Sequence, residues 1–431
     1  MERNRLQKRL FYFKITLFVL LISSLIVIVK AQDSGNMWSQ TFGSLEEDVA
    51  KSLVQTSDGG FVVAGYTKTT DIDGDAWLVK TDASGNLEWN HTFGEEDWDR
   101  VNSLIKTSDG GYALAGYTHS FSAGFGDFWL IKTDSSGNME WNKIFGEYDL
   151  DRANSLVETS DKGFALAGYT NSFGAGHYDF WLIKTDSSGN LEWNQTYGGL
   201  NEDIAWSLIQ TSDGGFALAG ETLSFGAGDH DFWLVKTDSS GNMEWNQTYG
   251  KEDYDFAYSI VESIDGGYAL TGISRSEVSA DFWLIKTNNY GQIQWDKRYR
   301  RGTHSGAYSL LVTSDGGYAL AGYSHSIFGT TGTDFWLVKT DPYGNIQLNQ
   351  TYGGTETDHA YAVVETSSGG FALAGFTKSY GNGGQDYWLV KTDEYGNIPE
   401  FPSWALLPFV LIFSLVTLIF KKLTKVRKLN S

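Results

Sequence analysis

The sequence predicts an all-β fold, a seven-bladed β-propeller with four-stranded blades. The first observation is a sequence motif, Asp-aromatic-Trp-Leu-Ile/Val-Lys-Thr, that occurs seven times. In the first copy Ala76 takes the place of the aromatic residue. The second is the spacing of its copies, which are 50 to 53 residues apart. A period near fifty residues with four short strand patterns is typical of one propeller blade. The tryptophans of the seven copies are Trp77, Trp129, Trp181, Trp233, Trp283, Trp336 and Trp388.

Residues 151–199 show the strands of one period. The first strand alternates polar and apolar residues, and the second carries small residues that let neighbouring sheets approach closely. The turn between these strands reads Ser-Asp-Gly-Gly in most copies, as at Ser108–Gly111, because Gly accepts a positive φ and Asp bonds its own backbone. The four strands predicted in this period are residues 152–159, 164–170, 179–185 and 191–197.

The repeat count predicts how the ring closes. The seventh period stops at Pro399, before its fourth strand, and the missing strand pattern stands at the front of the chain: residues 34–43 closely match residues 240–250. We expect residues 35–42 to pair with the last blade and close the ring, which protects the sheet edges. The alternative is an open solenoid, which has no need of a split repeat.

The N-terminus predicts export. A basic stretch precedes the apolar run Ile15–Val29, and small residues follow at the positions that define cleavage, so residues 1–31 read as a signal peptide cut before Gln32. The alternative is an uncleaved signal anchor. The propeller is then expected to span residues 32–398.

The C-terminus predicts a membrane anchor. Residues 399–403 form a Pro-containing neck, residues 404–420 are an uncharged apolar run that predicts one transmembrane helix, and residues 421–431 form a basic cytoplasmic tail. Both ends give the same orientation. We therefore expect a single-pass protein of the cell membrane with an extracellular propeller.

Charge and composition narrow the function classes. Residues 1–31 and 421–431 each carry a net charge of +5, which leaves −31 on the remainder of a chain whose total is −21. A domain this acidic is a poor binder of nucleic acid or anionic lipid. The chain has no Cys, which excludes disulfides, a thiol nucleophile and Cys metal sites.

The residues Trp-Leu-Ile-Lys-Thr-Asp-x-x-Gly-Asn-x-x-Trp, as at Trp181–Trp193, resemble the quinoprotein-type (PQQ-like) propeller repeat. The resemblance covers residues 35–398 and implies the fold. Quinone-dependent dehydrogenases of that superfamily usually have eight blades, and this sequence shows no distinct quinone ligand set, so no quinone cofactor is expected. Residues 398–404, Ile-Pro-Glu-Phe-Pro-Ser-Trp, resemble the PEF-type sorting signal of archaeal surface proteins. That resemblance implies processing near residues 399–401 by a sortase-like enzyme; the alternative is a plain anchor.

The loops after the second and fourth strands are expected to share one face, here termed the variable face, because nearly all variation in length and composition falls on them. Its links after the fourth strand are acidic, and oxygen ligands in flexible loops suit Ca²⁺. The alternative is a solvated acidic rim, since no copy shows a full calcium loop. The candidate ligands are Asp71, Asp73, Asp75, Glu96, Asp97, Asp99, Glu252, Asp253 and Asp255.

Two irregularities offer candidate ligand-binding residues. One link is basic instead of acidic and suits either an acidic partner or local salt bridges; its cations are Lys297, Arg298, Arg300 and Arg301. The second lies in the innermost strands, where one position is polar in three blades and aromatic in four: Lys51, Asn102, Asn154, Trp206, Tyr258, Tyr308 and Tyr361. Facing the channel, the four aromatics would form a stacking surface for a sugar or an extended peptide; facing between blades, they would be core.

Four Asn-x-Thr sequons, at Asn90, Asn194, Asn246 and Asn349, fall on the outermost strand and are glycosylation candidates in an exported chain. The alternative is cross-sheet pairing of Asn and Thr. No catalytic residue stands out. The leading hypothesis is a non-catalytic surface module for adhesion, envelope assembly or capture of an extracellular glycan or protein. The alternatives are an extracellular enzyme, dependent on a quinone or metal or acting on polysaccharide, and a structural coat.

Overall fold

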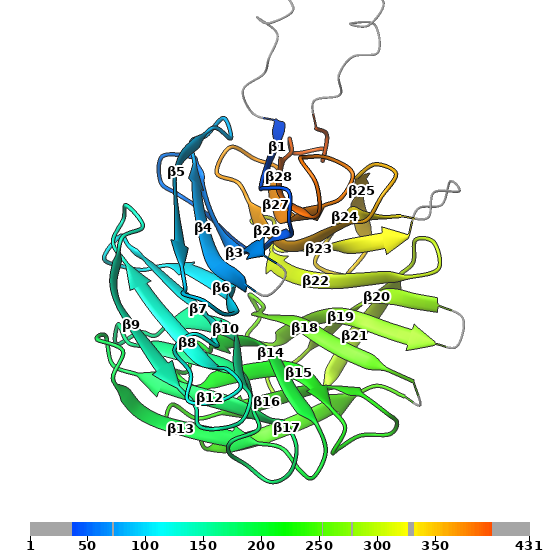
Figure 1. Ribbon diagram of the computed structural model, residues 1–431. Coiled ribbons are helices and arrows are strands. Elements are labelled where there is room, and N and C mark those ends of the chain that lie inside the picture. The colour runs from blue at the N-terminus through cyan, green and yellow to red at the C-terminus, as the bar shows by residue number, and fades with distance from the viewer. Residues whose placement is uncertain (1–36, 71–72, 252, 277–278, 326–331, 399–431) are drawn as a thin grey trace, which may run out of the picture.

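Seven four-stranded antiparallel sheets surround a central axis in the computed structural model, which describes residues 37–70, 73–251, 253–276, 279–325 and 332–398 (Figure 1). The predicted seven-bladed propeller with four-stranded blades is confirmed. The predicted signal peptide (1–31), the neck (399–403), the transmembrane helix (404–420) and the basic tail (421–431) lie outside the described residues. Within the residues described, no helix is long and apolar enough to cross a membrane.

Each blade runs outward from the axis, and the first strands of neighbouring blades adjoin at the centre. The first strands are β2 (Asp48–Gln55), β6 (Asp99–Lys106), β10 (Asp151–Glu158), β14 (Asp203–Gln210), β18 (Asp255–Glu262), β22 (Ser305–Val312) and β26 (Asp358–Glu365). The second strands are β3 (Phe61–Thr70), β7 (Tyr112–Thr118), β11 (Phe164–Thr170), β15 (Phe216–Thr222), β19 (Tyr268–Ser276), β23 (Tyr318–His325) and β27 (Phe371–Thr377). The third strands are β4 (Asp73–Thr81), β8 (Asp127–Thr133), β12 (Asp179–Thr185), β16 (Asp231–Thr237), β20 (Ser279–Thr287), β24 (Thr333–Thr340) and β28 (Asp386–Lys391). The outermost strands are β5 (Leu87–Phe93), β9 (Met139–Phe145), β13 (Leu191–Tyr197), β17 (Met243–Tyr249), β21 (Ile293–Tyr299), β25 (Ile346–Tyr352) and β1 (Trp38–Phe42).

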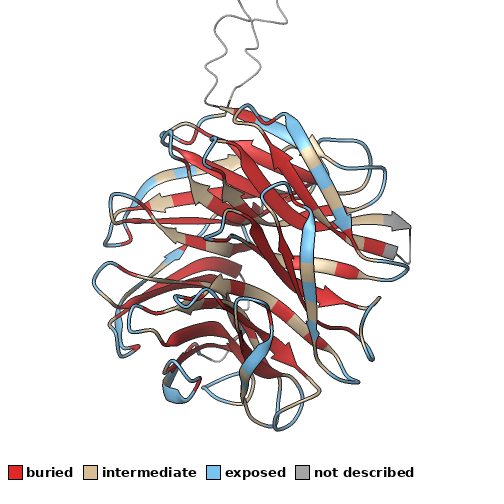
Figure 2. Cartoon of the chain, turned by 90° about the vertical axis from the view of Figure 1, so that its left-hand side faces the viewer, coloured by how far each residue is buried: buried red, intermediate tan, exposed pale blue. Residues whose placement is uncertain are grey.

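The sequence of each strand matches its depth. The middle strands β11 and β12 pack against the neighbouring blades and are buried along their whole length, whereas β13 carries many exposed residues. Figure 2 shows this contrast over the molecule, with buried strands inside and exposed residues on the outer strands and loops. Small residues in the second strand let adjacent sheets pack face to face, and a large aromatic from the third strand fills the space between them: Phe128 lies 4.6 Å from Trp181 of the next blade, ring centroid to ring centroid.

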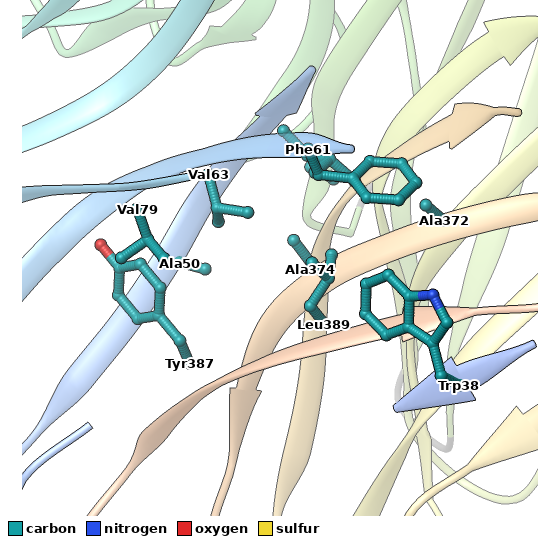
Figure 3. Close-up of a cluster of buried hydrophobic side chains, with 11 residues drawn as sticks. Trp38, Ala50, Phe61, Val63, Val79, Ala372, Ala374, Tyr387 and Leu389 are labelled. Carbon is teal, nitrogen blue, oxygen red and sulfur yellow. The ribbon is translucent and has the colours of Figure 1, made fainter. Parts of the chain in front are cut away.

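The ring closes as predicted. β1 pairs antiparallel with β28, from Trp38 opposite Lys391 to Phe42 opposite Tyr387. Trp38 is buried, contacts Phe61 of the first blade edge to face at 5.7 Å, and donates its indole N–H to the Ala83 carbonyl at 2.9 Å (Figure 3). One blade is therefore built from both ends of the described chain.

A buried lysine near the end of the third strand ties together the two tight turns of most blades. Lys184 Nζ lies 2.9 Å from Asp161 and 2.8 Å from Glu192. Blade seven differs, because Ser368 stands where Asp161 stands and β1 brings no glutamate. Lys391 forms no ion pair among the described residues, and burial lowers its pKa.

Candidate functional site

Every innermost strand is interrupted at the same place. In β10 the register breaks between Ala153 and Ser155, so Asn154 has no partner in the ladder. Such a β-bulge bends its strand and re-aims the extra side chain. The residues at the break in the seven strands are Lys51, Asn102, Asn154, Trp206, Tyr258, Tyr308 and Tyr361.

These seven side chains line one cavity on the propeller axis, with a volume of about 330 Å³. All seven are half-buried. The sequence left two orientations possible for these side chains, toward the channel or between the blades. In the structure they face the channel, and the alternative of packing between blades is wrong. The cavity is at the small end of the range of ligand pockets, roughly 300–1,000 Å³.

The aromatic residues form one continuous arc of the channel wall over blades four to seven. Trp206 lies 5.5 Å from Tyr258, Tyr258 lies 5.0 Å from Tyr308, and Tyr308 lies 4.9 Å from Tyr361, between ring centroids. Neighbouring rings hold one another in tilted or edge-on contact, which fixes their orientation. The arc therefore presents a preorganised apolar wall.

The polar residues form the rest of the wall, over blades one to three. Asn102 donates its amide N–H to the Ala153 carbonyl at 2.9 Å, and Asn154 donates to the Ala205 carbonyl at the same distance. The Lys51 ammonium lies 3.5 Å from the centre of the Tyr361 ring, where the two arcs meet. Burial, with a smaller contribution from Arg100, lowers the pKa of Lys51 to about 7.

Two arginines stand at the variable-face end of the polar arc. Arg100 and Arg152 each precede the channel residue of their strand by two positions. The Arg100 guanidinium lies 4.1 Å from the Tyr66 ring, and the Arg152 guanidinium lies 4.4 Å from the Tyr117 ring, both in the preceding blade. Neither arginine is among the site residues predicted from the sequence, although Asp-Arg opens only these two innermost strands.

A second missed group lies beside the aromatic arc. Glu221 takes the place that Tyr169 has in the previous blade, is buried, and accepts a hydrogen bond from the Trp206 indole N–H at 3.2 Å. His230 Nδ1 lies 3.0 Å from Glu221, and this contact raises the pKa of His230. Glu221 therefore couples a channel residue to the loop before β16. The break in the Ala-Gly-Tyr-Thr pattern was its signal in the sequence.

The calcium candidates whose side chains the structure describes lie either on strands or in the links of the variable face. Asp99 and Asp255 begin innermost strands and are buried; Asp99 Oδ2 accepts a hydrogen bond from Ser120 Oγ at 2.6 Å, and burial raises the pKa of Asp255 to about 6. Asp75, in β4, borders Gly94: a Cβ on that glycine would lie 2.2 Å from its Oδ1.

Glu96, Asp97 and Asp253 lie in the links of the variable face, and the first two are exposed. Asp71, Glu252 and the side chain of Asp73 lie outside the described residues. Among the residues that the structure describes, no three His, Asp or Glu side chains converge as a metal site would require.

The basic residues between blades five and six are partly engaged within the propeller. Arg300 forms an ion pair with Asp281 at 2.7 Å, and the Arg298 guanidinium lies 5.0 Å from the Trp283 ring. Arg301 donates to Thr351 Oγ1 at 3.4 Å, and Lys297 lies half-buried on β21. Of the two roles expected for the basic link, an acidic partner or local salt bridges, Arg300 has the second.

The sequon asparagines are exposed on the outermost strands and have a structural role. Asn194 Oδ1 accepts a hydrogen bond from the Trp181 indole N–H at 3.2 Å. The same bond forms at Asn90, Asn246 and Asn349. It also forms at Asn142, which is not part of a sequon. The bond to tryptophan therefore accounts for this Asn whether or not a glycan is attached.

Comparison with known proteins supports the fold. No protein-family profile matches the chain. A regulatory protein, FlaEY of Caulobacter vibrioides, is 26% identical over 174 residues, which cover 35% of this chain and 18% of that protein. The matched part thus spans less than a fifth of that relative.

Among solved structures, the Neurospora crassa Pan2 WD40 domain superposes with a TM-score of 0.51 and 11% identity, over 81% of this chain and 91% of that one. Sqt1 from Chaetomium thermophilum gives a TM-score of 0.48 and 12% identity, over 79% and 82% of the two chains. The similarity to the Pan2 WD40 domain shows that the chain shares the β-propeller fold of a known structure.

Proposed function

We propose that this protein is a surface-displayed binding module whose recognition site is the central channel. One observation carries the proposal: blades that are otherwise nearly uniform differ at the channel position, and the differences sort into one polar arc and one aromatic arc (residues given above). Preorganised aromatics beside convergent polar groups are typical of small-ligand sites. The similarity in fold to a WD40 propeller is in keeping with a binding role for this protein.

The surface location is part of the proposal. The basic and apolar N-terminal segment (1–31), the apolar run 404–420 and the basic tail 421–431 support an exported propeller on a single membrane anchor. The PEF-like segment and the four sequons fit the same location. The ligand we expect is an extracellular glycan or a protein segment that enters the channel.

A binding screen tests the proposal. The full chain, purified in detergent, is applied to a glycan array and to envelope extract, with calcium and with chelator. We expect selective binding that Trp206→Ala and Tyr258→Ala each reduce by at least about tenfold, since stacking side chains dominate such sites. The matched control is Tyr343→Ala, which removes an exposed tyrosine from a tight turn. Binding that survives both channel variants would place recognition elsewhere.

A further inference from the structure

The polar arc of the channel carries three cations in a strongly acidic protein. Lys51 lines the channel. Arg100 and Arg152 precede the channel residues Asn102 and Asn154 by two positions, and the charge of Arg100 is close enough to lower the pKa of Lys51. Within the described ranges none of the three forms an ion pair, although the third-strand lysines of blades one to four, such as Lys184, are each held by two carboxylates. Nearby unpaired cations of one sign create a local positive potential that attracts an anion.

The arginines are held in place and keep donors unused. Stacking on Tyr66 and Tyr117 orients both guanidinium planes. The Nε of Arg100 and the Nε of Arg152 are buried and have no hydrogen-bond acceptor. A buried N–H without an acceptor costs free energy, so an oxygen that reaches it is bound favourably. A carboxylate supplies such oxygens and matches the guanidinium fork.

The opposite arc suits the body of the same ligand. The C–H face of a pyranose ring stacks on aromatic side chains, and Trp206, Tyr258, Tyr308 and Tyr361 form such a wall across a cavity of about 330 Å³. That volume holds one sugar ring with some water. The acidic links around the variable face repel a polyanion, which favours a single acidic residue among neutral sugars.

We propose that the channel binds one uronic acid residue of a glycan, with its carboxylate against Lys51 and Arg100 and its ring against the aromatic arc. This inference rests on the proposed function and specifies its ligand class. Arg152 extends the cationic side of the site. The carboxylate supplies an acceptor to donors that the protein leaves unpaired, and the aromatic wall selects a ring over a small inorganic anion.

Isothermal titration of the full chain with three matched pairs of disaccharides tests the inference. In each pair a glucuronic, galacturonic or mannuronic acid replaces the corresponding neutral hexose, and a 6-sulfated disaccharide forms a further arm. We expect at least one uronic acid to bind about tenfold or more tightly than its neutral partner, because charge-assisted hydrogen bonds exceed neutral ones. Tighter binding of the sulfated sugar than of every uronic acid would overturn the choice of carboxylate.

Variants locate the effect. Lys51→Met and Arg100→Met keep the length and apolar stem of the side chain and should bring the acidic sugar down to the affinity of the neutral one. Lys106→Met is the matched control, because it removes an exposed cation from the opposite end of β6. Circular dichroism and thermal melting confirm that each variant is folded.

The outcomes separate the two proposals. Equal binding of acidic and neutral sugars, unchanged in both channel variants but lost in Trp206→Ala, overturns the uronic acid and leaves the channel as a recognition site. Loss of the acidic preference in Lys106→Met as well would show a general charge effect and overturn the inference. Absence of binding to every disaccharide overturns it too, and a silent array and extract would remove the proposed function with it.

Discussion

Arg300 and Asp281 form a two-point ion pair: Arg300 Nε donates to Oδ1 at 2.8 Å, and Nη2 donates to Oδ2 at 2.7 Å. At the corresponding place between blades three and four stands Gly198, and there a second carboxylate approaches. A Cβ on Gly198 would lie 1.8 Å from Asp179 Oδ1 and 2.8 Å from Asp203 Oδ2. Blade six has Ser305 where blade four has Asp203. One junction thus neutralises its buried carboxylate with arginine, whereas the other brings two acids together.

Removing this arginine should destabilise its junction. Arg300→Met leaves the Asp281 carboxylate, whose side chain is 6% exposed, without its charged partner. We expect a lower Tm than in the wild type, measured by differential scanning calorimetry. Asp281→Asn in the same background should recover most of the loss, because it removes the unpaired charge; no recovery would show that Arg300 acts through packing.

The buried carboxyl group of Asp255 predicts that the free energy of unfolding falls as the pH rises. Burial raises the pKa of Asp255 to about 6, with the neighbouring Asp231 a minor cause. A folded-state pKa above the unfolded value means that the folded protein holds the proton more tightly, so this stabilisation is complete at low pH and is lost between about pH 4 and pH 6. A shift of this size corresponds to about 2–3 kcal/mol.

Urea unfolding across that pH range measures the effect. Asp255→Asn should flatten the pH dependence of the unfolding free energy, and Asp253→Asn, in the same link but half-buried, is the control. An unchanged slope in Asp255→Asn would assign the dependence to other groups.

Blade seven predicts a stabilising substitution. Lys391 lacks the turn aspartate that its counterpart Lys184 has, and Ser368 occupies that place. Ser368→Asp should raise the unfolding free energy by roughly 0.5–1 kcal/mol, the scale of an ion pair with one solvent-exposed partner. The gain should disappear in a Lys391→Met background, and a gain that persists there would exclude the ion pair as its cause.

The closing strand predicts a large single-site effect. Trp38→Ala removes a buried indole from the contact between blades seven and one, and truncation of a core tryptophan costs about 3–5 kcal/mol. We expect a markedly lower Tm and faster proteolysis near β1. Leu45→Ala, at an exposed residue just after β1, is the control. Equal losses in both variants would show that β1 does not hold the ring.

The lowered pKa of Lys51 predicts that the affinity of the channel for an acidic sugar depends on pH. The pKa of Lys51 is about 7 because its ammonium is buried and Arg100 is near. His359 and Tyr361 are the other titratable groups beside it, and burial lowers the pKa of His359 to about 4. An anion binds the protonated lysine, so affinity for the acidic sugar should fall as the pH rises from 7 to 9. Lys51→Met should abolish this fall, and its persistence in the variant would exclude Lys51.

The repeat explains why so much of the fold was predictable. Residues 164–170, 179–185 and 191–197 are the strands β11, β12 and β13 to the residue, and the first strand differs by one position. The direction of the channel residues was not predictable. A regular strand alternates its faces every second residue, but the bulge at Asn154 breaks that alternation, and nothing in the local residue pattern fixes which way the extra side chain turns.

Contacts between distant parts of a blade were also beyond the pattern. Glu221 stood out as a substitution, yet its partner His230 lies beyond a loop, and the length of the loop does not fix where its side chains return. The same holds for Arg300, whose side chain turns back to Asp281 in the neighbouring strand of its own blade. Each was visible as a departure from the repeat, and only the structure supplies its partner.

Closure by β1 also determines how the propeller bears a mechanical load. Because β1 and β28 are antiparallel, residue 37, just before β1, lies near the end of β28, from which the chain continues to residue 398. A pulling force applied between these two residues acts across the strands at one end of the ladder. It separates the Trp38–Lys391 pair first and then the remaining β1–β28 pairs one after another. The strand that completes the ring is thus the element that yields first under tension.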